Sequence, residues 1–84
     1  MVQILIVDDS GFSRAMMVRE LTALGIDNSQ IKQAGSGDEA MAMLDAQPFD
    51  LFILDIVMTG IDGIAVLKAV KQKQPNAKVI MCSG

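Results

Sequence analysis

The chain has 84 residues, of which 51% are hydrophobic and 20% are charged, and its formal net charge is −3. This length allows one small domain, and the composition is that of a folded globular protein rather than a disordered one. Seven dispersed Lys and Arg residues form no basic patch for nucleic acid, and no apolar run approaches the ~20 residues of a membrane span. The N-terminus lacks the basic region of a secretory signal, so we expect a soluble, cytoplasmic protein.

The first predicted element is a strand over residues 2–7, which runs without a break into Asp8 and Asp9. A helix follows, because apolar residues recur there at helical spacing until Gly25 supplies a left-handed stop. The spaced residues are Met17, Leu21 and Leu24. A weaker apolar run over residues 31–34 predicts a second strand.

A second helix is predicted after Ser36, which can cap it, and it ends before Pro48. Two acidic residues fall in its first turn, and three of its apolar residues share one face. These residues are Asp38 and Glu39, then Ala40, Met43 and Leu44. The preceding GSGD stretch could suggest a phosphate-binding loop, but it lacks the lysine of such loops, so we interpret it as a helix start.

The third predicted strand covers residues 51–54 and is followed directly by Asp55. The turn residues TGIDG then lead into a third helix, with apolar residues at three-residue steps and lysines near its end. The apolar residues are Ile64, Leu67 and Val70, and the lysines are Lys68, Lys71 and Lys73. Pro75 lies beyond this helix, and residues 79–82 form the fourth predicted strand.

The order of elements is therefore β-α-β-α-β-α-β, which predicts an α/β fold with a parallel sheet and helices on its faces. Such folds bind ligands just outside the carboxyl ends of their strands. Asp8, Asp9 and Asp55 each follow or end a strand at this position. If the first and third strands are neighbours, the three carboxylates converge at one edge of the sheet.

Converging carboxylates need a positive partner, since two charges ~4 Å apart repel by roughly 4 kcal/mol at an effective dielectric near 20. The chain has no His, and its single Cys82 lies in the apolar run VIMC, where we interpret it as a core residue. A site made of oxygen ligands alone suits a hard cation, so we predict Mg²⁺, for which Mn²⁺ could substitute.

Ser83 follows the fourth strand and could place a hydroxyl near Asp55. Acids, a metal and a hydroxyl together are typical of phosphoryl transfer with a carboxylate as covalent acceptor. We predict Asp55 as that acceptor and Asp9 as the direct metal ligand.

The motifs ILIVDDS, GDEA, DLFILDIVM, IDG and VIMCSG resemble, in this order, the receiver domain of two-component response regulators, above all single-domain chemotaxis-type receivers. The resemblance implies a flavodoxin-like fold and phosphorylation of Asp55 by a sensor histidine kinase. It also implies that Asp9 binds Mg²⁺ directly, that Asp8 does so partly through water, and that the backbone carbonyl of Val57 completes the metal site. Ser83 corresponds to the hydroxyl that turns toward the phosphoryl group. A receiver is not an enzyme beyond its own phosphoryl transfer and dephosphorylation.

The chain departs from the family pattern in two places. Met58-Thr59 stands where the family usually has Met-Pro, which lowers the expected stiffness of that loop. Receivers also continue with a further helix, a fifth strand that carries a lysine, and a last helix, whereas this sequence ends at Gly84. We therefore expect residues 1–84 to be a partial receiver domain with the fold (βα)3β, and its phosphorylation to be impaired.

In the family's strand order 2-1-3-4-5, the strand over residues 79–82 would become an edge and could pair with another chain. We expect self-association at this edge. This leaves a second function open, an interaction or assembly module that keeps the acidic site but does not turn over phosphate. A dinucleotide-binding half-fold is disfavoured, because the first strand ends in DDSG rather than a glycine fingerprint.

Each candidate residue also has a plain structural interpretation. Asp8 and Asp9 could cap the first helix, Asp55 could simply start a loop, and Ser83 could belong to a turn. The seven Met residues could form an adaptable binding face, although filling of the core is the simpler explanation.

Overall fold

The structure is a computed structural model that describes residues 2–55 and 63–82. Within these residues, strands and helices follow one another in the predicted order. The elements are β1 (Ile4–Val7), α1 (Gly11–Ala23), the short 3-10 helix η1 (Asn28–Gln30), β2 (Ile31–Ala34), α2 (Gly37–Ala46), β3 (Leu51–Asp55), α3 (Gly63–Lys73) and β4 (Lys78–Cys82).

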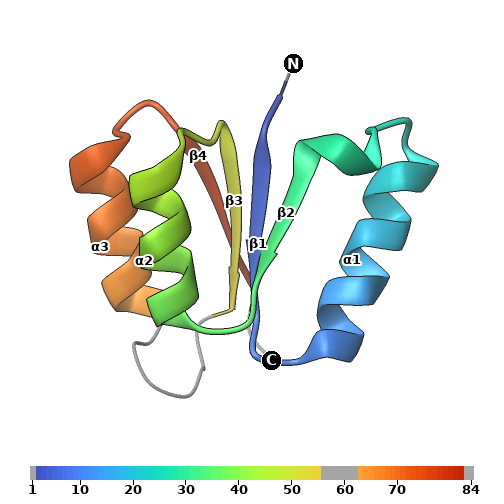
Figure 1. Cartoon of the computed structure of the whole chain (residues 1–84), viewed down its shortest axis with the longest axis horizontal. Coiled ribbons are helices and arrows are strands. Elements are labelled where there is room, and N and C mark those ends of the chain that lie inside the picture. Colours follow the sequence, from blue (N-terminus) through green and yellow to red (C-terminus); the bar gives the residue numbers. More distant parts are fainter. Residues whose placement is uncertain (1, 56–62, 83–84) are drawn as a thin grey trace.

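The four strands form one parallel sheet in the order β2-β1-β3-β4 (Figure 1). Ile4 pairs with Ile31 on one side and with Leu51 on the other, so β1 lies in the middle of the sheet. The carboxyl ends of β1 and β3 therefore lie side by side. This confirms the predicted α/β fold and the predicted strand neighbours.

The strand boundaries differ slightly from those predicted. The first strand begins at Ile4 rather than at residue 2, and Gln3 just before it is hydrogen-bonded to Asp50. The Gln3 N–H donates to Asp50 Oδ2 at 2.7 Å, and its carbonyl accepts from the Asp50 N–H at 2.8 Å. The third strand extends to Asp55, and the fourth begins one residue earlier, at Lys78.

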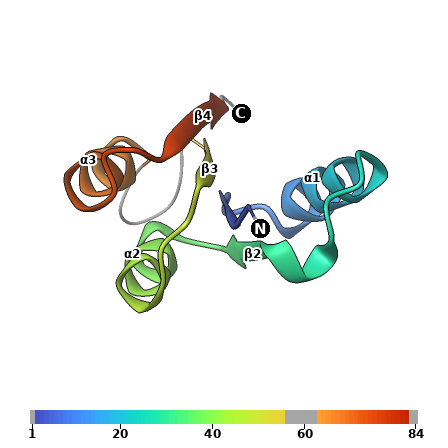
Figure 2. The same ribbon diagram turned by 90° about the horizontal axis from the view of Figure 1, so that it is seen from above.

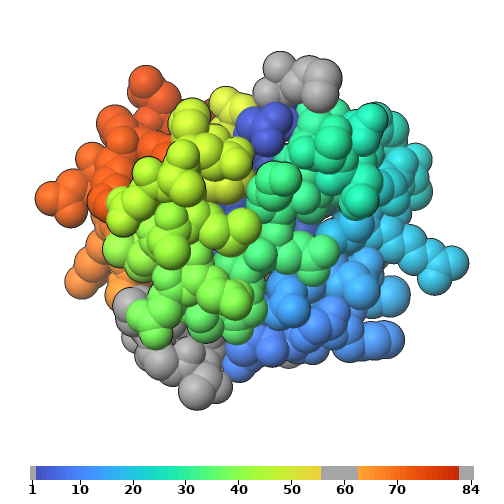
Figure 3. All heavy atoms as spheres, in the orientation of Figure 1, coloured from blue at the N-terminus to red at the C-terminus, as the bar shows by residue number. Residues whose placement is uncertain are grey.

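The helices cover the two faces of the sheet unequally (Figure 2). Helices α2 and α3 lie on one face and α1 lies on the other. In the space-filling view, the side chains of α2 and α3 pack beside one another, and those of α1 occupy the other side of the molecule (Figure 3). None of the described helices is long and apolar enough to cross a membrane.

Alternate residues of each strand supply two hydrophobic clusters. One lies beneath α2 and α3 and has strand members Leu5, Val7, Phe52 and Leu54. The other, built from Ile4, Ile6, Ile31 and Ile53, lies beneath α1. Burial of all these residues explains the unbroken apolar runs, since strands covered on both faces need apolar side chains at every position.

The buried face of α3 follows the apolar spacing of its sequence only in part. Ile64 is 43% exposed, whereas the buried positions of the helix are Gly63, Val66 and Val70. Three-residue steps drift by about 60° per step around a helix with 3.6 residues per turn, so a series at 64, 67 and 70 cannot keep facing the sheet. Steps of three and then four residues hold the face that packs on β3.

The helix ends follow the predicted chemistry. The Ser36 hydroxyl oxygen accepts a hydrogen bond from the Glu39 N–H at 3.1 Å and caps α2. Gly25 has a φ of 98°, a left-handed conformation that favours glycine, and it follows the end of α1.

Candidate functional site

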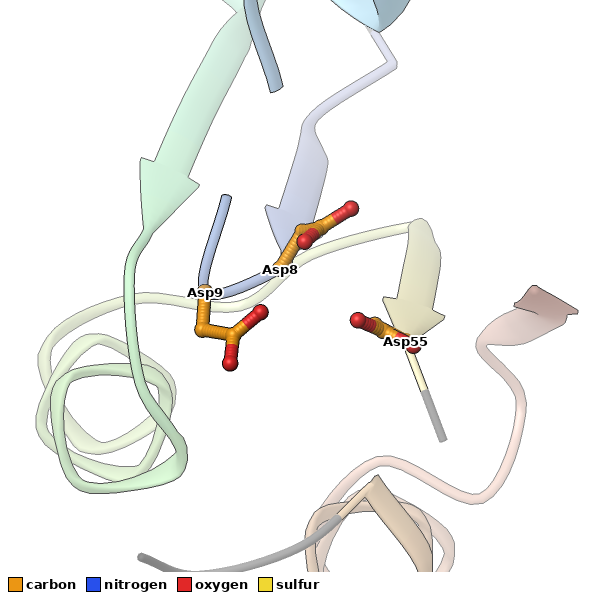
Figure 4. Close-up of side chains that lie close together, drawn as sticks. All are labelled: Asp8, Asp9 and Asp55. Carbon is orange, nitrogen blue, oxygen red and sulfur yellow. The ribbon is translucent and has the colours of Figure 1, made fainter. Parts of the chain in front are cut away.

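Three carboxylates meet at the carboxyl ends of β1 and β3. Asp8 and Asp9 follow β1, and Asp55 is the last residue of β3 (Figure 4). The β1–β3 ladder pairs Val7 with Leu54, so Asp8 and Asp55 lie one residue further along neighbouring strands. One carboxylate oxygen from each aspartate lies within 4.8 Å of the other two. The predicted convergence is confirmed.

The three acids differ in their contact with solvent. Asp8 is 6% exposed and Asp55 is 8% exposed, whereas Asp9 is exposed. Burial makes charge repulsion stronger, because water no longer screens it. Asp9 therefore forms the open side of a cluster whose other two members lie in the protein.

The backbone around Asp8 is held by hydrogen bonds from three elements. Its N–H donates to the Ala34 carbonyl at 3.1 Å, a hydrogen bond of the last β1–β2 pair, Val7 with Ala34. Its carboxylate Oδ1 accepts from the Ser10 N–H at 2.9 Å and closes the turn before α1. Its carbonyl accepts from Arg14 Nη1 at 2.6 Å.

Helix α1 is capped by Ser10 and not by the aspartates. The Ser10 hydroxyl oxygen accepts from the Ser13 N–H at 3.2 Å. The interpretation of Asp8 and Asp9 as helix caps is therefore wrong, and both side chains remain at the sheet edge with Asp55.

The donor set of this site fits a hard divalent cation. It consists of carboxylate oxygens that can approach one another closely, and Mg²⁺ prefers such ligands together with water. A cation would offset the repulsion among the acids, and the exposed side at Asp9 leaves room for water ligands. An acidic cluster of this kind is typical of the Mg²⁺ site of receiver domains.

Two of the predicted site residues, Val57 and Ser83, lie outside the described residues. The register pair Asp55–Cys82 does put the end of β4 next to the end of β3.

Sequence reasoning missed one residue, Arg14, which contacts the backbone of Asp8. Nothing in the six-residue spacing between Asp8 and Arg14 indicates a contact of the side chain with a carbonyl. The contact depends on how the turn between β1 and α1 is folded.

A hollow at the opposite end of the sheet was not predicted either. It is lined by Phe49, Asp50, Gln74 and Ala77 among others, near the starts of β3 and β4. It contains none of the three clustered aspartates.

The family match and the most similar relatives described here agree with one another. Residues 4–84 match the response regulator receiver domain. The chain is 39% identical over 84 residues to the chemotaxis protein CheY of Listeria monocytogenes, covering 100% of this chain and 69% of that protein. It is 38% identical over 82 residues to CheY of Bacillus subtilis, covering 98% of this chain and 67% of that protein.

A solved structure is similar over nearly the whole chain. The response regulator TrrA from Thermotoga maritima, determined in complex with Mg²⁺ and beryllium fluoride, has a TM-score of 0.89 and 36% sequence identity. The match covers 99% of this chain and 70% of that one. The flavodoxin-like sheet and the acidic cluster at its carboxyl edge agree with this similarity. Because residues 4–84 match its family model, the chain belongs to the response regulator receiver domain family.

Proposed function

We propose that this chain is a phosphoacceptor signalling domain in which Asp55 receives a phosphoryl group from a phosphohistidine of a sensor histidine kinase. In this proposal residues 1–84 make up part of a receiver domain. The observation that carries it is the convergence of Asp8, Asp9 and Asp55 within 4.8 Å at the carboxyl edge of the sheet. Similarity to CheY proteins supports a chemotaxis-type role.

The proposed reaction is a transfer between two covalent carriers. A carboxylate oxygen of Asp55 attacks phosphorus, an O–P bond forms, and the N–P bond of phosphohistidine breaks. The released imidazole nitrogen keeps the bonding electrons and takes up a proton. Water later hydrolyses the acyl phosphate, which restores the carboxylate and releases inorganic phosphate. The chain therefore catalyses only reactions of its own side chain.

The proposed metal ligands are Asp9 directly, Asp8 partly through water, Asp55, and the backbone carbonyl of Val57. The convergence of one oxygen from each carboxylate within 4.8 Å supports the three aspartates as ligands of one ion. When bound, Mg²⁺ would neutralise negative charge on the transferred group. The protein contributes fixed carboxylates, so that little reorganisation is needed when the donor arrives.

Ser83 is proposed as the hydroxyl that hydrogen-bonds to the phosphoryl group. The register pair Asp55–Cys82 supports this role, because residue 83 directly follows the partner of the acceptor. A hydroxyl at this point could donate to a phosphoryl oxygen on Asp55.

The function is tested by incubating the chain with acetyl phosphate and Mg²⁺ and measuring its intact mass. We expect the wild type to gain one phosphoryl group, Asp55→Asn to gain none, and Asp9→Ala to react far more slowly. Asp38→Asn is the matched control, because Asp38 is an exposed acid in the first turn of α2. An adduct that persists in Asp55→Asn, or no adduct with either Mg²⁺ or Mn²⁺, would contradict the proposal.

A second candidate function, assembly with another copy of the chain, is favoured by the edge of the sheet at β4. Among the described strands, β4 pairs only with β3, and a strand at the edge of a sheet can pair with a strand of another chain. Ile80 on this strand is 50% exposed and lines an apolar groove. The other lining residues are Met17, Glu20, Leu21, Leu24 and Ile53. We propose that a second copy associates along this edge.

Light scattering after size-exclusion chromatography tests the assembly. Ile80→Lys should shift the protein toward monomer, because a charge would replace apolar surface at the edge. Ile64→Lys is the control, since Ile64 is similarly exposed, at 43%, but lies on α3 at the other face. If the wild type is monomeric at every concentration from the low micromolar range to its solubility limit, this second function is ruled out.

A further inference from the structure

The side chain of Arg14 reaches from α1 back over the turn that carries the acids. Its Nη1 donates to the Asp8 carbonyl at 2.6 Å, and its Nε donates to Gln33 Oε1 on β2 at 3.3 Å. The residue is half-buried, and one guanidinium therefore links α1, β2 and the end of β1. Hydrogen bonds from a charged donor are stronger than those between neutral groups.

The bonded carbonyl belongs to the peptide between Asp8 and Asp9. A peptide unit is planar, so the direction of the Asp8 carbonyl also fixes the direction of the Asp9 N–H and the position of the Asp9 Cα atom. On the other side of Asp8, its own N–H is held by the Ala34 carbonyl. Arg14 therefore fixes the last peptide plane before the exposed member of the cluster.

The guanidinium lies close to Gly35 in the connection from β2 to α2. A Cβ atom at this position would lie 3.2 Å from Arg14 Nη1 and 3.3 Å from Glu39 Oε2, both tight contacts. The Gly35 N–H meanwhile donates to Glu39 Oε2. The guanidinium thus lies against the backbone of residue 35, and a side chain there would press on it.

We propose that Arg14 is a positioning residue for the metal site. By holding the Asp8–Asp9 peptide plane, it keeps the Asp9 carboxylate where it can bind the same ion as Asp8 and Asp55. This inference rests on the proposed function, because it assumes that the three acids bind Mg²⁺. Residues that orient metal ligands typically change metal affinity by 10–100-fold when they are replaced.

The test is titration of the chain with Mg²⁺ by calorimetry, without any phosphodonor. Arg14→Met keeps much of the aliphatic stem but removes the donors, and we expect its dissociation constant to rise about tenfold. Arg14→Lys retains a donor and should recover part of the affinity. Arg19→Met is the matched control, since it removes the same charge from an exposed position on α1, and it should stay within about twofold of the wild type.

A second variant covers the case in which Arg14→Met does not fold, as judged by its circular dichroism. Gly35→Ala leaves Arg14 in place but crowds its guanidinium, so it should also weaken Mg²⁺ binding. Equal affinities for wild type, Arg14→Met and Arg19→Met would overturn the inference, as would an unchanged affinity in Gly35→Ala if that is the variant measured.

These variants distinguish the Mg²⁺ site itself from the role of Arg14 at that site. If wild type and Asp9→Ala both show no Mg²⁺ binding, the proposed metal site is wrong, and the role of Arg14 is wrong with it. If the wild type binds Mg²⁺, Asp9→Ala does not, and Arg14→Met binds like the wild type, only the role of Arg14 is wrong.

Discussion

The two faces of the sheet differ in how well they are covered. Beneath α2 and α3, buried side chains from strands, helices and the α2–β3 connection pack together. Phe49 in that connection and Phe52 on β3 have ring centroids 5.6 Å apart in an edge-to-face arrangement. Beneath α1, the buried residues come from the strands alone, because none of the residues of α1 is fully buried. The helix contributes only partly buried side chains, such as Met17 and Leu21.

The difference between the two faces bears on Asp8 and Asp9, because the turn that carries them is joined to α1. The turn that carries Asp8 and Asp9 leads directly into α1, and the Arg14 contact to Asp8 comes from α1 as well. The acids are therefore anchored on one side by the well-buried strands β1 and β3, and on the other by the less buried helix. We infer that most of the folding free energy comes from the α2–α3 face, and that the geometry of Asp9 is sensitive to the α1 face.

Large-to-small substitutions on the two faces give the largest expected contrast. Phe52 is fully buried beneath α2 and α3, and Phe52→Ala should lower the free energy of unfolding by about 3–5 kcal/mol. Leu21 on α1 is only half-buried, so Leu21→Ala should cost about 1–2 kcal/mol. Urea denaturation with a common m-value measures both. Equal losses would mean that α1 is packed as tightly as α2 and α3.

Local opening of α1 should be visible by native-state hydrogen exchange. Amides in α1 should exchange through openings of lower free energy than amides in α2, since α2 buries Ala40 and Leu44. Ser10→Ala removes the cap of α1 and should lower its opening free energy by about a further 1 kcal/mol. Ser36→Ala is the matched control and should act on α2 instead. Similar protection of both helices in the wild type would contradict the contrast between the faces.

The sequence predicts the fold because its strands are buried on both faces. Apolar residues at every position of 4–7 and 51–54 distinguish these segments from amphipathic helices, and their alternation with helical spacing implies a parallel sheet. The meeting of Asp8 with Asp55 also follows, since the carboxyl ends of neighbouring parallel strands coincide. The order of the strands is therefore sufficient to predict that Asp8 and Asp55 meet.

Other features depend on side-chain geometry that a pattern does not contain. Ser10 rather than Asp8 or Asp9 caps α1, because the chain continues for two residues past β1 before it turns into the helix. The contact of Arg14 with the Asp8 carbonyl requires both that turn and the space at Gly35. The buried face of α3 depends on a helix phase that the even spacing of Ile64, Leu67 and Val70 misrepresents.

The smallest expected effect on stability concerns the connection between α1 and β2, on the face of the sheet that α1 covers. Here η1 is held by polar contacts: Asp27 Oδ1 accepts from the Ser29 N–H at 2.9 Å, and Gln30 Oε1 accepts from the Asp27 N–H at 3.2 Å. The hydrogen bond from the Ser29 backbone, with a smaller contribution from the Ser29 side chain, lowers the pKa of the Asp27 carboxyl below its usual value of 3.8.

Because the folded pKa is depressed, Asp27 contributes stability at any pH above 3.8, and this contribution is lost as the pH falls below 3.8 through the folded pKa. Asp27 is fully exposed, so solvent screening keeps the effect small. We expect the stability of Asp27→Asn to fall less steeply than that of the wild type in this acid range, and the two proteins to have parallel pH profiles near neutrality. Chemical unfolding at a series of pH values measures this, together with an NMR titration of the Asp27 carboxyl carbon. A carboxyl that titrates at 3.8 or above would show that the α1–β2 connection is not held by its cap, and α1 would then be joined to the sheet even more loosely than its burial indicates.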